Sequence, residues 1–420
     1  MKENRTGSAF AYVTVLFFIW GAVTSVNDVL IPAVKAIFAL SDTESFLTQF
    51  AFFLAYGVVS LPAAALLGRI GSANAIILAL ATMILGCLLM PVATAVRAYP
   101  IVLVGLFVIA SGITLLQVAA NPLSAVLGRP ERSHFRLVLS QAFNSFGTVV
   151  GPYLAAQTLL RGGLFDGGPV TEAKIAYSLG RIDVAYFFIA GVIAVLAAFL
   201  WRARGRISAA APPPEVGTSV ASAFSSPWAL AGAAAIFLYV GAEVAIGSVM
   251  VNFLEQPDVL AVSAVRAGEL VSLYWLGAMV GRFVGSALLT RLPAGPLLTA
   301  VAALAALMCL VVSQTTGTTA GVVAIAIGLF NSIMFPVIFT LTIERSTAPS
   351  SATSGLLCMA IVGGAFVPLL FAQVADATGS RFLAFFVPMA CYLLIMVFGW
   401  RAARTAVTCP IEAGTPAAAH

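Results

Sequence analysis

Long apolar runs recur along almost the whole chain, and this feature decides what the chain can fold into. A run of about 20 apolar residues forms a helix that just crosses the hydrocarbon core of a bilayer. Twelve such runs lie at residues 10–31, 45–67, 73–95, 99–127, 134–160, 183–201, 227–254, 262–290, 294–314, 318–345, 351–376 and 381–401. They predict an all-α integral membrane protein with twelve transmembrane helices.

The composition agrees with a membrane solvent. Hydrophobic residues make up 61% of the 420 residues and charged residues only 9%, whereas soluble domains carry about 25% charged residues. The net charge of +5 is assigned to loop topology, because no lysine or arginine cluster is interleaved with aromatic residues as a nucleic-acid surface requires. The expected partners are therefore the lipid bilayer and a small solute, with no nucleic acid, and a monomer is expected.

The hydrophobic pattern stops once for a longer stretch, at residues 202–226. This stretch holds three arginines, the triple proline at 212–214 and many small residues, and we interpret it as a cytoplasmic linker that cannot continue a helix. The predicted domains are an N-terminal six-helix bundle (1–201), the linker (202–226), and a C-terminal six-helix bundle with a short cytoplasmic tail (227–420).

Short segments of the two halves resemble each other. ALLGRIG at 65–71 and ALLTRLP at 287–293 follow the second and the eighth run, and GTVVGPYL at 147–154 corresponds to GGAFVPLL at 363–370. A parallel duplication of six helices is typical of the major facilitator fold, in which two pseudo-symmetric bundles rock about a site near the bilayer midplane.

The basic residues predict the orientation. With both termini in the cytoplasm, 14 of the 21 lysines and arginines lie on the inner side and 7 on the outer side, which is the asymmetry of the positive-inside rule. Lys2 and Arg5 ahead of an apolar stretch imitate a signal peptide. Since no convincing small-residue cleavage site follows, we interpret this stretch as an uncleaved first span.

The cysteines and histidines do not form a recognisable site. Four of the five cysteines lie inside apolar runs without Cys-x-x-Cys spacing, and His134 and His420 have no second ligand at helical spacing. We expect no metal centre, no cofactor and no enzyme, because no nucleophile, base or metal constellation appears at membrane depth. His134, at the start of the fifth run, is expected to be interfacial.

Several long motifs resemble a known family. They are FFIWGAVTSVNDVLIP, ASGITLLQVAANPLSAVLG, RLVLSQAFNSFGTVVGP, YVGAEVAIGSVMVNFL, YWLGAMVGRFVGSALL and NSIMFPVIFTLTIE followed by SGLLCMAIVGGAFVPLL. They are similar to the glucose/galactose branch of the fucose–galactose–hexose proton symporter family. The resemblance implies a sugar transporter of the bacterial inner membrane, coupled to a cation gradient. Fucose permeases carry a glutamate where this chain has Gln117, so a proton-carrying role is not available at that position.

Asp28 is a carboxylate near the far end of the first apolar run. A charge in a helix centre costs about 2.5 to 3.5 kcal/mol on insertion scales, so such residues usually face a bundle interior or a watery cavity. Asp28 is a candidate cation-coupling residue, either as a proton carrier or, with oxygens of Thr24 and the neighbouring Asn27, as a Na⁺ ligand. The alternative is an aspartate at the periplasmic end that is hydrated by water.

Glu243 is the second deep carboxylate, well inside the seventh run. It is a candidate for hydrogen bonding to sugar hydroxyls or for a second cation site. The alternative is a structural partner for a polar group on another helix.

A sugar site needs neutral hydrogen-bonding groups and some apolar or aromatic surface. Amides on one face of the fourth and fifth runs fit this need, since they must point at protein or water. The alternative for each is an interhelical hydrogen bond, worth about 0.6 kcal/mol on average. The predicted substrate-binding residues are Asn27, Gln117, Gln141, Asn144, Glu243, Asn331 and the stacking ring Trp275.

Other motifs indicate mechanical roles. Gly277, Gly281 and Gly285 form a ridge of small residues that permits close helix contact. Prolines inside the fourth, fifth, tenth and eleventh runs are expected to bend helices. Several charged residues lie near cytoplasmic ends, among them Glu344, Arg345 and Arg282. They are expected either to form salt bridges between the bundles or to snorkel, which means that the side chain extends along the helix until its charge reaches water.

The sequence therefore predicts cation-coupled symport of a hexose such as glucose or galactose by alternating access, with H⁺ or Na⁺ as the coupling ion. The alternatives are transport or export of another small polar solute, uncoupled facilitation, and a membrane sensor that does not transport. The amide-rich fourth and fifth runs argue against an exporter of cationic drugs, and the short loops argue against a sensor.

Overall fold

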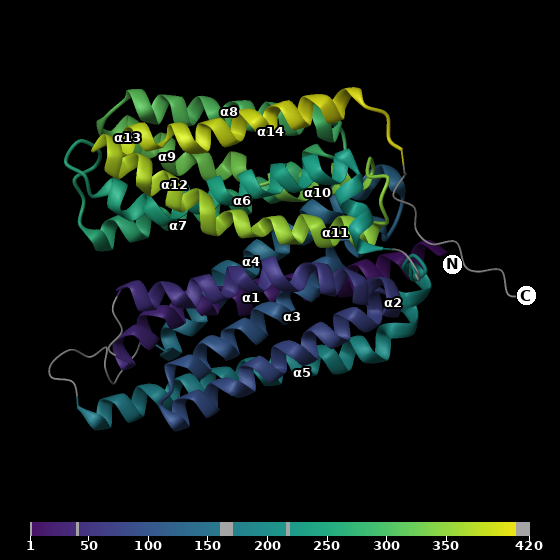
Figure 1. Cartoon of the computed structure of the whole chain (residues 1–420), viewed down its shortest axis with the longest axis horizontal. Helices are drawn as coiled ribbons and strands as arrows, with labels where there is room; N and C mark the ends of the chain where they lie inside the picture. Colours follow the sequence, from purple (N-terminus) through teal and green to yellow (C-terminus); the bar gives the residue numbers. More distant parts are fainter. Residues whose placement is uncertain (1, 39–41, 160–170, 216–218, 409–420) are drawn as a thin grey trace, which may run out of the picture. The chain divides into compact units, whose positions relative to one another are not determined.

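The computed structural model describes residues 2–38, 42–159, 171–215 and 219–408, and within these ranges the regular structure is helical, with no strand (Figure 1). The side chains of residues 2–6, 8, 26–37, 42–49, 152, 154–159 and 264–265 are not among those described. The described residues form two compact units: unit 1 comprises residues 2–38, 42–128, 143–159 and 171–215, and unit 2 comprises 129–142 and 219–408. The predicted domain limits at 201 and 227 remain a prediction.

Unit 1 is a helical bundle built around a long, bent helix. Its helices are α1 (Lys2–Ile37), α2 (Asp42–Val96), α3 (Tyr99–Val126), the later part of α4 (Ser133–Leu159) and α5 (Glu172–Ala210). Helix α2 packs against α3 and α5, and α1 packs against α5 and α3.

Unit 2 contains the remaining elements. They are η1 (Pro130–Arg132) with the first residues of α4, η3 (Val220–Ser225), α6 (Pro227–Leu254), α7 (Ala264–Leu288), α8 (Ala294–Gln314), α9 (Gly317–Asn331), α10 (Met334–Ile343), α11 (Ser350–Met359), η4 (Ala360–Val362), α12 (Gly363–Thr378), α13 (Arg381–Ala384) and α14 (Phe386–Arg404). Helix α6 packs against α10, α12 and α14, while α8 packs against α9 and α14.

Gly71 separates the second and third predicted spans inside α2. Its φ of 76° and ψ of 165° are not helical. Glycine tolerates positive φ because it has no Cβ. The ribbon labelled α2 therefore consists of two helices that meet at Gly71, as the break predicted between residues 67 and 73 requires.

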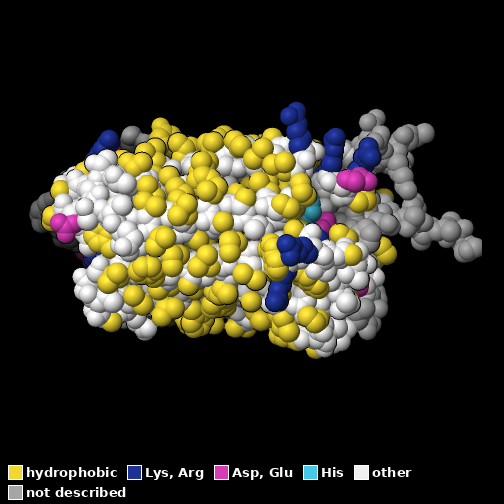
Figure 2. Space-filling view, turned by 90° about the horizontal axis from the view of Figure 1, so that it is seen from above, with side chains coloured by type: hydrophobic (Ala, Val, Ile, Leu, Met, Phe, Trp, Pro, Cys, Tyr) yellow, Lys and Arg dark blue, Asp and Glu magenta, His cyan; other side chains and the backbone are white. Residues whose placement is uncertain are grey.

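The described helices account for the twelve predicted spans. Nine helical stretches of the described residues are long enough and apolar enough to cross a membrane, and three of them join consecutive labelled helices: α9 with α10, α11 with α12, and α13 with α14. One of them is the double helix α2, and α1 and α4 supply the first and fifth spans. Many apolar side chains point outward, and Phe188 and Val195 are 70% and 72% exposed. On the face drawn in Figure 2 hydrophobic side chains are dense along the middle and basic side chains gather towards one end, as a membrane belt requires.

Helix α5 is longer than its apolar run. It begins at Glu172, eleven residues before the predicted span, where the Thr171 hydroxyl accepts a hydrogen bond from the backbone N–H of Lys174. It continues through residues 202–210 and ends before the triple proline. The prediction that this stretch cannot continue a helix is therefore wrong for 202–210, because polar residues end a membrane span without ending a helix.

Close backbone contacts join α1 to α4 inside unit 1. A Cβ added at Gly147 would collide with the backbone carbonyl of Phe18, and one added at Gly21 with that of Asn144. In unit 2, Cβ atoms on Gly281 and Gly285 of α7 would likewise collide with residues 329–333, so the predicted glycine ridge is confirmed as a place of close helix packing.

Replacement of Gly147 by Val is expected to destabilise the protein by about 1–3 kcal/mol or more, since the added methyl groups overlap the α1 backbone. A matched control is Gly180→Val in α5, where an added Cβ meets nothing within 4 Å. The midpoint of heat unfolding in detergent should fall for the first variant and stay near the parent value for the second. Equal midpoints for the two variants would contradict this packing.

Candidate functional site

Gln117 of α3 is held by a tyrosine of α2. Its Nε2 atom donates a hydrogen bond to Tyr56 Oη at 2.5 Å, and both side chains are buried. One turn earlier, the Thr114 hydroxyl donates to the carbonyl of Ala110 in its own helix. The bond to Tyr56 fixes the orientation of the Gln117 amide, and the sequence analysis did not single out this tyrosine.

Asn144 of α4 contacts the first helix. Its Nδ2 atom donates to the backbone carbonyl of Phe17 at 3.0 Å. An interhelical hydrogen bond of this kind is the predicted alternative to a sugar contact. It uses the Nδ2 end of the Asn144 amide.

The predicted cation site on α1 is described only in part. The Thr24 hydroxyl donates to the carbonyls of Trp20 and Gly21, at 2.8 and 3.0 Å. Asn27 and Asp28 continue the same helix, but their side chains lie outside the described residues. Their roles therefore stay predictions.

Glu243 has a basic partner on a neighbouring helix of unit 2. Its Oε1 atom lies 3.8 Å from Arg282 Nη2, and the two side chains are 13% and 14% exposed. Arg282, which is predicted to lie near a cytoplasmic end, is six residues before the end of α7. Its side chain faces α6, so Glu243 takes part in a largely buried ion pair.

A proline explains the second contact of Arg282. Pro336 has no N–H, so the carbonyl of Ser332, four residues earlier, loses its normal helix partner. The helix is interrupted there between α9 and α10, and Arg282 Nε donates to the Ser332 carbonyl at 3.0 Å. Arg282 thus bridges the Glu243 carboxylate and a carbonyl that the proline has freed.

Tyr274 connects two of the predicted site residues. Asn331 Nδ2 donates to Tyr274 Oη at 2.7 Å, and Tyr274 Oη donates to the backbone carbonyl of Glu243 at 3.2 Å. Asn331 and Tyr274 are completely buried. The structure therefore brings Glu243 and Asn331 together around the Tyr274 hydroxyl.

Further polar atoms inside unit 2, around Tyr274, are candidates for binding a polar solute or water. Within the described part of the chain, six buried side-chain nitrogen and oxygen atoms of unit 2 have no hydrogen-bond partner. Four of them belong to this interior: Tyr239 Oη, Glu243 Oε1, Asn331 Oδ1 and Tyr392 Oη. A buried polar atom without a partner is costly. We refer to Tyr239, Glu243, Tyr274, Arg282, Asn331 and Tyr392 as the unit 2 polar cluster.

Trp275 lies beside this cluster but not within it. Its ring meets Tyr274 edge to face, with centroids 5.1 Å apart and an interplanar angle of 83°. It is 44% exposed, so one side of the indole is available to a ligand or to lipid, and its predicted stacking role stays a prediction.

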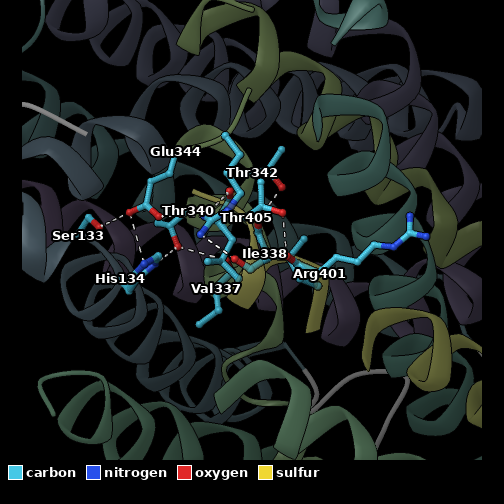
Figure 3. Close-up of polar contacts among 12 residues, drawn as sticks. Ser133, His134, Val337, Ile338, Thr340, Thr342, Glu344, Arg401 and Thr405 are labelled. Atoms are coloured by element: carbon cyan, nitrogen blue, oxygen red, sulfur yellow. Dashed lines mark hydrogen bonds and ion pairs between the residues drawn. The ribbon is translucent and has the colours of Figure 1, made fainter. Parts of the chain in front are cut away.

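A second group of polar contacts joins the start of α4 to the end of α10 (Figure 3). The Ser133 hydroxyl donates to Glu344 Oε1 at 3.0 Å, and His134 Nε2 lies 3.4 Å from the same oxygen. The other ring nitrogen of His134 is 2.6 Å from Thr340 Oγ1. His134 is therefore part of a polar network, and its interfacial depth stays a prediction. Gln141, two turns along α4 on the same face, is buried as well.

The contacts of this network favour the ionised form of Glu344. Burial opposes its charge, but hydrogen bonds from His134 and Ser133 and the nearby Arg345 outweigh burial and hold the pKa of the carboxyl below its usual value. Arg345 contacts Glu344 Oε2 at 3.3 Å and donates to the carbonyl of Ala402 at 2.9 Å. These charges form a buried network, so the predicted alternative of snorkelling surface charges is wrong for Glu344 and Arg345.

Comparison with known proteins identifies the family of this chain. Residues 13–368 match the family model described as Major Facilitator Superfamily. The chain belongs to the major facilitator superfamily. It is therefore a multi-pass membrane transporter, and the predicted fold of two six-helix bundles is confirmed.

Two curated relatives align with almost the whole length of this chain. A glucose/galactose transporter of Brucella abortus biovar 1 (strain 9-941) is 42% identical over 406 residues, which is 95% of both chains. An L-fucose-proton symporter of Escherichia coli (strain K12) is 29% identical over 414 residues, covering 94% of this chain and 93% of the relative.

A solved structure is similar over the same length. FucP, described as a major facilitator transporter in the outward conformation, has a TM-score of 0.83 and 27% sequence identity, with 94% of this chain and 99% of that chain covered. The similarity extends over both halves of the chain, so the helices above have their counterparts in a known transporter fold.

Proposed function

We propose that this transporter carries out symport of a hexose, such as glucose or galactose, with a cation by alternating access. The observation that carries the proposal is the 42% identity over 95% of both chains with a protein named a glucose/galactose transporter. The structure supports it with neutral hydrogen-bonding groups. Gln117 and Asn144 in unit 1 and the unit 2 polar cluster supply amides and phenols of the kind that recognise sugar hydroxyls.

The proposed sugar-contacting residues are those that the sequence indicated: Asn27, Gln117, Gln141, Asn144, Glu243, Asn331 and Trp275. Asn331 is the best supported in unit 2, because Tyr274 holds its Nδ2 atom and its Oδ1 atom has no partner among the described residues. A fixed amide with an available acceptor suits a sugar hydroxyl, which donates one hydrogen bond.

The proposed coupling ion is H⁺, and the proposed carrier is Asp28. A proton is favoured over Na⁺ by the similarity to two proteins named L-fucose-proton symporters. Glu243, the other candidate for the coupling residue, already has Arg282 at 3.8 Å, so we propose it as a sugar contact and not as the proton carrier. The proposed location is the bacterial inner membrane with both termini in the cytoplasm.

Uptake into proteoliposomes tests the function. The purified protein is supplied with labelled glucose or galactose while pH and Na⁺ gradients are imposed independently. Accumulation above equilibrium with an acidic outside, and no response to Na⁺, is expected. Accumulation driven only by Na⁺ would overturn the choice of ion, equilibration without accumulation would indicate a facilitator, and no hexose uptake would point to another solute.

Replacement of Gln117 by Ala is expected to weaken sugar binding several-fold, because one hydrogen bond is worth about 0.5–1.5 kcal/mol. Equilibrium binding in detergent measures the effect. Thr114→Val is a matched control on the same helix face, since the Thr114 hydroxyl already donates within its own helix, and it should change affinity less than two-fold. An unchanged affinity for Gln117→Ala would place this amide outside the pocket.

A further inference from the structure

An apolar groove lies between α1 and α5 on the outer surface of unit 1. It has a volume of about 570 Å³ and is lined by Ile19, Phe188, Gly191, Val192, Val195, Leu196 and Phe199. Phe188 and Val195 are among the most exposed large hydrophobic side chains of the described residues. In a membrane-spanning chain such a surface faces lipid rather than water, and the groove is a hollow within it.

The groove has the length of one lipid leaflet. Along α5 it extends from Phe188 to Phe199, which is about 16 Å at a rise of 1.5 Å per residue. Half of a hydrocarbon core of about 30 Å is about 15 Å. An acyl chain from one leaflet therefore fits along the groove.

Basic residues continue the same face of α5 beyond the groove. Phe188, Val192, Val195 and Phe199 recur at helical spacing, and the next positions of this stripe are Arg202 and Arg206. These two arginines are exposed and lie one to two turns past Phe199, at the depth where lipid headgroups begin.

A residue of α1 fixes Arg206 at the end of the groove. Arg206 Nη1 donates to Tyr12 Oη at 3.4 Å, and the Tyr12 ring meets Phe199 edge to face at 5.1 Å. Both walls of the groove, α1 and α5, therefore contribute to its basic end. Arg204 is different, because it points to another side of α5 and stacks on Trp201 at 4.0 Å.

We propose that this groove is a specific binding site for an anionic phospholipid such as phosphatidylglycerol. One acyl chain lies along Phe188, Val192, Val195 and Phe199, and Arg202 and Arg206 bind the phosphodiester. The apolar wall and the positive charge at one end match the two chemical parts of such a lipid. The site is independent of the transported solute.

Native mass spectrometry of the full-length protein in mixed micelles tests the site, with phosphatidylglycerol titrated against phosphatidylcholine. The double variant R202Q/R206Q should bind phosphatidylglycerol about thirty-fold more weakly, because each basic residue near a lipid surface is worth about 1 kcal/mol. The control R204Q/R404Q removes the same charge from two arginines that stack on Trp201 and Trp400. It should change the affinity less than three-fold.

Photocrosslinking with phosphatidylglycerol that carries a diazirine on its acyl chain locates the bound lipid. The labelled peptides should contain residues 188–199, and Gly191→Trp, which fills the groove at an open position, should remove the labelling. Equal weakening by the two double variants, equal affinity for phosphatidylcholine, or labelling that does not change with Gly191→Trp would each overturn the proposal.

Discussion

Replacement of Asp28 by Asn is expected to abolish accumulation of sugar against its gradient while exchange of sugar across the membrane continues. An amide cannot take up and release a proton, so the cation gradient no longer drives the cycle. One charge moved across 100 mV is worth about 2.3 kcal/mol, which corresponds to roughly fifty-fold accumulation. In proteoliposomes the variant should reach only equilibrium, with a concentration ratio near one.

The matched control for this variant is Asp376→Asn. Asp376 is an exposed carboxylate near the end of α12, and its loss changes the net charge by the same amount without touching the proposed coupling site. Accumulation should stay at the parent level. If Asp28→Asn also accumulates sugar undiminished, Asp28 does not carry the coupling ion, and Glu243 becomes the residue to replace next.

The helices could be located from the sequence because hydrophobicity reports burial in lipid directly. The predicted runs 227–254 and 294–314 coincide with α6 and α8. The break at Gly71 was found because glycine and charge interrupt the apolar pattern there. The pattern failed at α5, where the helix continues beyond the membrane on both sides, since the hydrogen bonds of a helix do not depend on lipid.

The sequence could predict which residue types lie in the site, but not which side chains contact each other there. The sequence identified Glu243 and Asn331 as polar residues at depth, because lipid makes such residues costly. It could not show that both contact Tyr274, since this depends on the rotation of α6, α7 and α9 about their axes. For the same reason the sequence could not identify Arg282 as the partner of Glu243. Two signals were present, because a buried carboxylate needs a cation nearby, and Pro336 leaves a helix carbonyl without its usual donor.

Replacement of Arg282 by Met is expected to destabilise the protein by about 3–5 kcal/mol, because it leaves the Glu243 carboxylate buried without its cation. The Ser332 carbonyl also loses its donor. Unfolding in detergent, followed by heat or by denaturant, measures the change. The double variant Glu243→Leu with Arg282→Met should recover most of the loss, since both charges are then absent and the apolar side chains can pack.

The pair Arg266–Glu269 in the same helix supplies the control for this prediction. Its two atoms are closer, at 2.6 Å, but the side chains are 61% and 58% exposed. Water screens an exposed pair, so Arg266→Met should cost at most about 1 kcal/mol. Burial rather than distance then decides the strength of an ion pair in unit 2. If Arg282→Met costs no more than Arg266→Met, the Glu243–Arg282 contact does not hold the unit 2 polar cluster together.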